Sequence, residues 1–351
     1  MTENAVSTTP GSRLSALARK LWFPFFLLLL TILTYGLLTF RQGFYLDDWY
    51  IILFKGKLGN QGFMLYFSQD RPFLSYPYVL LMAVFGESAV NWAIFALVMR
   101  WVTTCTFWQL LNKLFPDQKK LWIWATVLFA VYPGFRFHWF AIMYAFGYIF
   151  LTFYLLSFFA MAKALDHTSK PWLYGFWTLL GLFFLLIGIV PQEYFFGMEL
   201  FRPILLYILV WRAAPDRQKT TWRRAFLHWL PYFAVFIAFT AYRILRSSAY
   251  AYQVGVLDQL SAAPLPTLLG LAKQAVISVS DALVFSWWKA FKLVAQNRFW
   301  PGVIPLLAVI VSALALLLVG LFPRKENVTL PFNARQGWRL ALAGLFLCFV
   351  A

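Results

Sequence analysis

A series of apolar segments runs along this chain, and each is long enough to cross, or nearly cross, a lipid bilayer. A helix needs about 20 apolar residues to span the hydrocarbon core. Eight segments meet or approach this length: 21–40, 88–111, 121–137, 139–162, 172–190, 194–211, 226–241 and 300–322. A ninth begins at Trp338 and stops at Ala351, so we expect the chain to be cut off within a span. Because lipid tolerates only helices and closed barrels, these segments predict an all-α bundle of about eight to nine transmembrane helices.

The composition excludes an ordinary soluble enzyme. Of the 351 residues, 62% are hydrophobic and only 12% are charged, and the mean hydropathy is +0.69. The net charge of +17 would favour a nucleic-acid partner in a soluble protein, but in a membrane protein it more often encodes orientation. We therefore expect membrane lipids and no nucleic acid among the partners. A polar tail over 1–20 would precede a single multi-spanning domain over 21–351.

The distribution of Lys and Arg predicts which side of the cell membrane each loop faces. Of the 30 basic residues, 17 lie in the tail 1–20 and in alternate loops at 113–120, 163–170, 212–224 and 324–339. Positively charged loops are retained in the cytoplasm. We therefore expect a multi-pass protein with a cytoplasmic N-terminus, and the first loop, 41–75, at the outer face with interfacial helices.

Segment 263–288 is apolar enough to be ambiguous. It carries Lys273 and Asp281, and if it crossed the bilayer the basic segment 324–339 would fall outside. We therefore favour an interfacial helix or a re-entrant pair over a span.

Two adjacent acids, Asp47 and Asp48, open the outer loop among aromatic and apolar neighbours. Carboxylates that meet water but point into an aromatic cavity have raised pKa values, which suits a general base or a metal ligand. The alternative is that one of them caps an interfacial helix running through Phe54. The sequence leaves both interpretations open.

Two further motifs accompany the acids. The same loop closes with Asp70-Arg71-Pro72, and the turn after the third apolar segment contains Pro133, Arg136 and His138. With the order of spans and loops, these motifs resemble the GT-C superfamily of membrane glycosyltransferases, most closely bacterial enzymes that use a polyprenyl-phosphate sugar. The resemblance covers roughly residues 20–245. It departs from the family pattern at Asp70, which stands where relatives usually have Gly.

The resemblance implies sugar transfer from a polyprenyl-phosphate donor to a lipid, glycan or protein acceptor at the outer face, usually with inversion. Asp48 would be the catalytic base, with Asp47 as the second choice. Metal use varies in the family, so Asp47 and Asp48 would also be the ligands of any Mg²⁺ or Mn²⁺. A phosphodiester at the membrane surface needs cations and hydrogen-bond donors. The expected substrate-binding residues are Asp70, Arg71, Arg136, His138, Glu193, Arg243 and Arg246, with interfacial anchoring as the alternative for Arg136, His138, Arg243 and Arg246.

Charges inside spans have a different interpretation. Arg100 lies midway along the second apolar segment, while Glu199 and Arg202 are spaced to pair on one helix face. For this pair we favour a buried ion pair that fixes helix packing. For Glu193, at the outer end of the fifth apolar segment, an ion pair of this kind and a place in the cavity both stay open.

Two rival functions remain at the level of sequence. A transporter or lipid flippase would concentrate polar groups at mid-bilayer and often shows two similar halves, and an envelope scaffold would make the acid pair incidental. Because the acids gather in an outer loop and no repeat is detectable, the sequence favours the enzyme.

Overall fold

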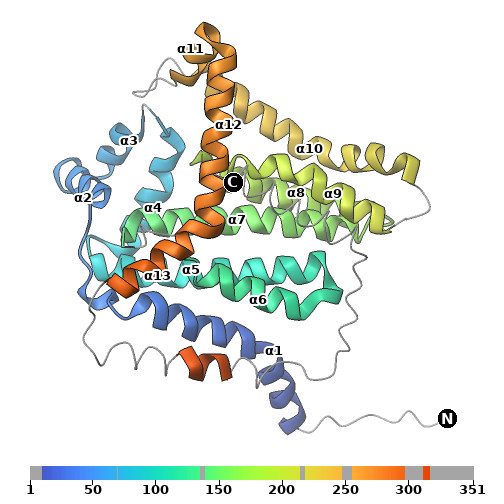
Figure 1. Cartoon of the computed structure of the whole chain (residues 1–351), viewed down its shortest axis with the longest axis horizontal. Helices are drawn as coiled ribbons and strands as arrows, with labels where there is room; N and C mark the ends of the chain where they lie inside the picture. The colour runs from blue at the N-terminus through green and yellow to red at the C-terminus, as the bar shows by residue number, and fades with distance from the viewer. Residues whose placement is uncertain are drawn as a thin grey trace.

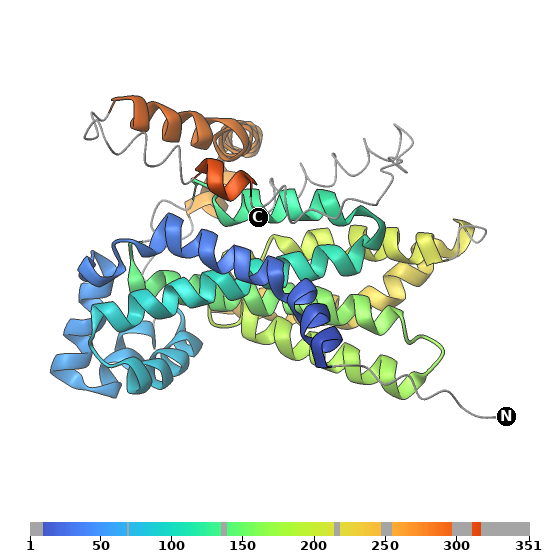
Figure 2. The same ribbon diagram turned by 90° about the horizontal axis from the view of Figure 1, so that it is seen from below.

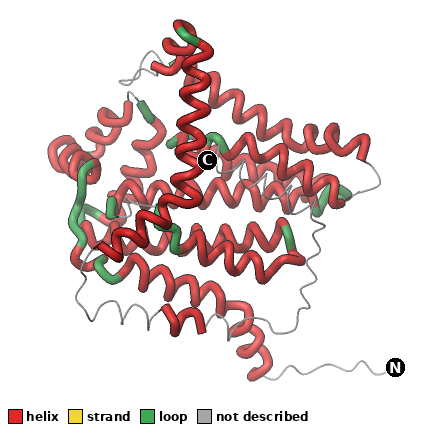
Figure 3. The backbone as a smooth tube through the Cα atoms, viewed as in Figure 1, coloured by secondary structure: helices red, strands yellow, loops and turns green. Residues whose placement is uncertain are grey.

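The fold of the chain is known from a computed structural model, which describes residues 10–68, 70–134, 139–213, 218–246, 255–296 and 311–316. Throughout these ranges the regular secondary structure is helical, with loops and turns between the helices (Figure 3). The expected all-α architecture is therefore confirmed.

Six helical segments are long and apolar enough to cross a membrane. They are Leu21–Arg41, Ala89–Leu114, Ala141–Leu165, Pro171–Ile189, Thr220–Leu245 and Pro264–Leu293. The first includes most of α1 (Pro10–Thr31) with the short turns η1 (Ile32–Gly36) and η2 (Thr39–Arg41). The next four correspond to α5 (Ala89–Leu114), α7 (Ala141–Leu165), α8 (Pro171–Ile189) and α10 (Gln218–Leu245). The protein is a multi-helix membrane protein with six candidate spans.

The expected count of eight to nine spans is not confirmed. Two of the predicted spans form shorter helices, α6 (Lys119–Ala130) with 12 residues and α9 (Met198–Ala213) with 16. Of the predicted span 300–322, only 311–316 falls within the described part of the chain, and the ninth segment lies outside it.

The α7 helix is the centre of the bundle. In its apolar window 67% of the residues are buried, against 33% or less in the other five candidate spans. It lies between α5 and α8 (Figure 1), and small residues let its neighbours approach closely. Ser157 of α7 donates a 2.7 Å hydrogen bond to the carbonyl of Gly181 in α8. A Cβ atom at Gly181 would lie 2.5 Å from the Tyr232 hydroxyl of α10, so a larger residue there would displace the tyrosine.

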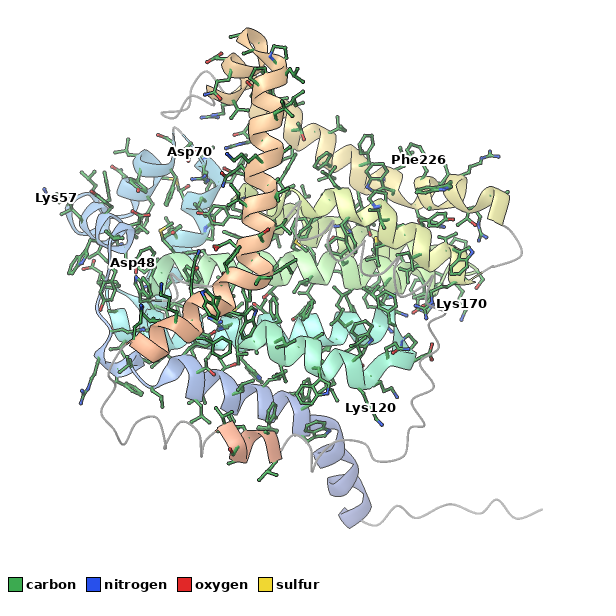
Figure 4. The ribbon with its side chains drawn as sticks, in the orientation of Figure 1. Asp48, Lys57, Asp70, Lys120, Lys170 and Phe226 are labelled. Carbon is green, nitrogen blue, oxygen red and sulfur yellow. The ribbon has the colours of Figure 1, made fainter. Side chains whose placement is uncertain are left out.

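Three of the basic loops meet at one end of the bundle. Lys113, in the last turn of α5, pairs with Asp166, after α7, and Arg212 at the end of α9 donates a 2.6 Å hydrogen bond to the carbonyl of Leu114. Figure 4 shows Lys120 and Lys170 toward this end and Asp48 toward the other. The alternate basic loops that were used to predict the orientation therefore lie together at one end of the bundle. The side of the membrane that this end faces stays a prediction.

The first predicted outer loop, together with the residues up to Phe85, folds into short helices at the opposite end of the bundle. They are α2 (Asp47–Leu58), α3 (Asn60–Ser68), the turn η3 (Pro72–Leu74) and α4 (Ser75–Phe85) (Figure 1). Their buried aromatic side chains join the main bundle, since Tyr78 of α4 stacks on Phe146 of α7 with ring centroids 4.0 Å apart.

The helices over residues 255–296 contact the bundle through Tyr132, whose hydroxyl donates a 2.8 Å hydrogen bond to the carbonyl of Ala282. The short α11 (Gly255–Ala262) precedes α12 (Pro264–Ser280), the π-helical turn η8 (Asp281–Phe285) and α13 (Ser286–Gln296). Figure 2 shows α12 and α13 outside the layers of the bundle, and in Figure 1 α12 runs steeply across α7. Although Pro264–Leu293 is long enough to span, its apolar window is 0% buried. The interfacial position expected for 263–288 stays a prediction.

Candidate functional site

Asp48 is buried against the first turn of α7. Its side chain is 0% exposed, and its two carboxylate oxygens lie 3.2 Å from the amide nitrogen of Met143 and 3.5 Å from that of Ile142. The first amides of a helix lack partners within the helix, so a carboxylate there satisfies them. Asp48 thus caps a helix, although it caps α7 rather than α2, in whose first turn it lies.

Burial raises the pKa of Asp48 to about 6, because desolvation outweighs the amide hydrogen bonds that favour its ionised form. The residue therefore changes its protonation state near neutral pH. A carboxylate with such a pKa has the basicity expected of a general base.

Leu46 turns the chain sharply before the two acids. Its backbone has φ 41° and ψ −111°, and within the described ranges it is the only residue other than glycine with a positive φ. Such strained backbone costs about 1–3 kcal/mol and clusters at functional sites. The turn sets Asp47 and Asp48 in opposite environments, since Asp47 is exposed while Asp48 is buried.

Asp47 lines a cavity of about 460 Å³. Most of the wall comes from one face of α7, where Tyr144, Gly147, Tyr148 and Leu151 follow at helical spacing. The remaining lining residues are Phe140, Met143, Tyr194 and Phe195. The cavity is therefore aromatic and apolar, with a single carboxylate on its wall.

A cluster of two arginines and two acids adjoins this cavity. Arg71 binds Glu193 through two hydrogen bonds, of 2.8 Å from Nη2 to Oε1 and 3.2 Å from Nε to Oε2. Arg243 reaches the same Oε1 atom at 3.1 Å and donates to the carbonyl of Asp70 at 2.8 Å. The Asp70 carboxylate lies 2.6 Å from Arg71. The two side chains of Arg71 and Arg243 therefore share one carboxylate oxygen.

Glu193 belongs to the turn η5 (Glu193–Phe195), whose other two residues line the cavity. Burial alone would raise its pKa, but the hydrogen bonds and charge of Arg71, together with the charge of Arg243, outweigh burial and lower it. Glu193 is therefore ionised at neutral pH. The same short turn joins the arginine cluster to the cavity wall.

Arg246 extends the cluster toward α3. Its Nη2 atom donates a 3.1 Å hydrogen bond to the carbonyl of Ser68. Arg243 and Arg246 thus both tie the end of α10 to the loop 41–75. Seven of the nine residues selected from the sequence lie at this end of the bundle, namely Asp47, Asp48, Asp70, Arg71, Glu193, Arg243 and Arg246. The other two, Arg136 and His138, lie outside the described residues.

Three charged side chains buried in the bundle, Arg100, Glu199 and Arg202, have partners there. Glu199 and Arg202 are both 0% exposed and form a 2.6 Å ion pair, and Tyr154 donates to the same carboxylate at 2.8 Å. This confirms the buried ion pair predicted for them. Arg100 donates to the hydroxyl of Tyr148 at 2.7 Å, and its guanidinium lies 3.3 Å from the centroid of the Tyr35 ring.

The oxygen atoms of Asp47 and Asp48 do not form a binding site for a divalent cation. Within the ranges that the structure covers, no three His, Cys, Asp or Glu side chains gather closely enough to hold a metal ion. Asp48 has both oxygens directed at backbone amides, which leaves Asp47 as the one accessible carboxylate of the pair.

Sequence reasoning missed three parts of this site. The tyrosine-lined face of α7 has a helical spacing that could have been found, but apolar and aromatic residues at such spacing are common in any buried helix. No signal in the sequence marks the strained backbone of Leu46 or the capping of α7 by an acid from α2.

Comparison with known proteins assigns no family to this arrangement. No family model matches the chain, and no curated protein and no solved structure matches it.

Proposed function

We propose that the protein is an integral membrane glycosyltransferase that moves a sugar from a polyprenyl-phosphate donor to an acceptor at the outer membrane face. One observation carries the proposal. The turn η5 contributes Glu193 to the arginine cluster and contributes Tyr194 and Phe195 to the cavity that Asp47 lines. Two guanidinium groups suited to a lipid phosphate and a carboxylate suited to proton removal thus belong to one continuous site.

Asp47 is the group that meets the acceptor. It is exposed on the cavity wall, whereas Asp48 is buried and bonded to α7. The geometry therefore favours Asp47 as the base, with Asp48 as a positioning residue that fixes α2 against α7. This reverses the order expected from the resemblance.

The reaction follows from these positions. Asp47 accepts the proton of an acceptor hydroxyl, and the acceptor oxygen attacks the anomeric carbon of the donor sugar. The bond between that carbon and the phosphate oxygen breaks, and the polyprenyl phosphate leaves with the bonding electrons. Arg71 and Arg243 stabilise the negative charge that develops on the leaving phosphate.

The transporter alternative lacks a comparable observation. Three charged residues buried in the bundle are bonded to neighbouring side chains, namely Arg100, Glu199 and Arg202. A substrate pathway at mid-bilayer would need such groups to face the substrate instead.

The proposal is tested by sugar transfer in proteoliposomes. Radiolabelled polyprenyl-phosphate sugar would be the donor, and an envelope extract from the producing cells would supply the acceptor. Asp47→Asn should lower transfer by about 10²–10⁴-fold, the usual contribution of a general base. Asp117→Asn is the matched control, because Asp117 lies after α5 at the opposite end of the bundle and is 74% exposed. Full transfer by Asp47→Asn, or donor movement across the bilayer with no transfer by the wild type, would reject the proposal.

A further inference from the structure

The carboxylate of Glu193 occupies a position suited to a ligand anion. Its Oε1 atom accepts hydrogen bonds from Arg71 and Arg243, and its Oε2 atom accepts another from Arg71. An anion with two oxygens held by two guanidinium groups is the arrangement in which arginines also bind phosphate. The protein therefore fills its own anion site with a side chain.

Resting on the proposed function, we propose that Glu193 is a specificity-determining residue: a resident carboxylate that an anionic phosphodiester headgroup must displace in order to bind Arg71 and Arg243.

Glu193 is positioned to leave the site. It lies in a turn of three residues rather than inside a helix, and its side chain is 30% exposed. The ion pair of Glu199 and Arg202 gives the contrast, because both partners are 0% exposed, belong to α9 and are bonded to α7 as well. One pair is enclosed by the bundle, whereas the other is reached from solvent.

The arginines keep their positions after Glu193 leaves. Arg71 retains its 2.6 Å contact with the Asp70 carboxylate, and Arg243 retains its 2.8 Å hydrogen bond to the Asp70 carbonyl. The binding site is therefore preorganised for an incoming anion, which lowers the cost of binding.

Charge balance selects the class of ligand. Arg71, Arg243, Asp70 and Glu193 carry two positive and two negative charges, so these four groups are neutral together. The neighbouring Arg246 donates to the carbonyl of Ser68 instead of to either acid. A phosphodiester carries one negative charge and replaces Glu193 without changing this balance. A phosphate monoester carries about −1.5 to −2 at neutral pH, and the remaining carboxylate of Asp70 repels the additional charge. The exchange thus favours a diester donor over a monoester product.

Displacement of Glu193 also affects the wall of the cavity. Tyr194 and Phe195 follow Glu193 in η5 and form part of the cavity wall. Displacement of Glu193 by a headgroup therefore shifts residues that surround Asp47, which couples donor binding to the shape of the acceptor pocket.

Equilibrium binding to the full chain in lipid nanodiscs tests the exchange. The probes are radiolabelled methyl farnesyl phosphate, which is a diester, farnesyl phosphate, which is a monoester, and neutral farnesol. Glu193→Gln keeps the shape of the side chain but removes its charge, so we expect the Kd for the diester to fall about tenfold, which corresponds to 1.4 kcal/mol. The preference for diester over monoester should decrease in the variant, and farnesol binding should not change. Glu87→Gln, at an exposed acid after α4 and outside the cluster, is the matched control.

A Kd for the diester that is unchanged or raised in Glu193→Gln overturns the proposal, because a competitor cannot be removed without tightening binding. Should that variant fail to fold, Glu193→Asp shortens the side chain and must tighten binding by a smaller factor, and its failure to do so counts equally against the exchange. Arg243→Ala should weaken diester binding at least tenfold and reduce the gain from Glu193→Gln in the double variant.

Binding and transfer are measured separately, so the two proposals can fail independently. If Glu193→Gln binds the diester more tightly but the protein transfers no sugar, the proposed exchange at Glu193 stands and the proposed glycosyltransferase function is rejected. If the protein transfers sugar but Glu193→Gln binds the diester as the wild type does, the glycosyltransferase function stands and the exchange is rejected.

Discussion

The buried carboxylate of Asp48 makes stability depend on pH in a way that Asp48→Asn should abolish. In the folded protein the side chain is 0% exposed and its pKa is about 6, against 3.8 for a free carboxyl group. Since the pKa is higher in the folded state, the protonated form is the one that folding favours. The stabilisation is complete below pH 3.8 and is lost as the pH rises through 6.

The difference in pKa sets the size of the effect. Two units correspond to about 3 kcal/mol between the two extremes, of which about 2 kcal/mol is lost between pH 4.5 and pH 7.5. Asparagine stays neutral and removes this loss. Its single carbonyl oxygen serves the amides of Ile142 and Met143 less well than two oxygens do, which costs about 1 kcal/mol. At pH 7.5 the variant should therefore be more stable than the wild type by about 1–2 kcal/mol.

Thermal unfolding in detergent, followed by tryptophan fluorescence at pH 4.5 and pH 7.5, measures both quantities. The wild type should lose stability over this range relative to Asp48→Asn, and comparing the two proteins cancels the titration of all other groups. Asp117→Asn should keep the slope of the wild type, because Asp117 is 74% exposed. If Asp48→Asn were less stable than the wild type at both pH values, Asp48 would be a stabilising cap and the cost assigned to its burial would be refuted.

Two further predictions concern the bundle and its orientation. Glu199→Gln should destabilise the protein by about 3–5 kcal/mol, because it leaves Arg202 buried without a counter-charge. The double variant Glu199→Leu/Arg202→Met should unfold close to the wild-type temperature, and an equal loss of stability in both variants would contradict this account. In intact cells an impermeant thiol reagent should label a single cysteine at Ser68, but should label one at Lys170 only after the membrane is permeabilised, since the two positions lie at opposite ends of the bundle. Labelling of both positions in intact cells would exclude the predicted topology.

Apolar length alone predicted most of the helices but not where they end. The predicted span 121–137 stops as α6 at Ala130, before the turn that contains Pro133 and Gly134. The predicted span 194–211 begins as α9 only at Met198, because Tyr194 and Phe195 belong to η5 and face the cavity. Aromatic residues that pack in a turn have the same hydropathy as aromatic residues that extend a helix, so a count of apolar residues cannot separate them.

The sequence identified the charged residues of the site but not their pairing. Arg71 meets Glu193 across 122 positions, and Arg243 meets the Asp70 backbone across 173. Contacts of this kind depend on how α8 and α10 pack, which no local pattern records. The sequence also did not show which of Asp47 and Asp48 is exposed to the cavity. Adjacent residues at the start of a helix point in directions that the preceding backbone sets.

The cavity is apolar because the groups behind it are already bonded. Tyr148 lines the cavity, and its hydroxyl accepts a hydrogen bond from Arg100, whose charge is buried between α5 and its neighbours. The Arg100 charge is thereby kept out of the cavity. An apolar wall lowers the local dielectric constant, and in such surroundings a charged group acts more strongly on a reacting atom than it would in water. Asp47 on that wall and the two arginines bound to Glu193 in the adjoining turn η5 are therefore the groups through which the proposed sugar transfer would act.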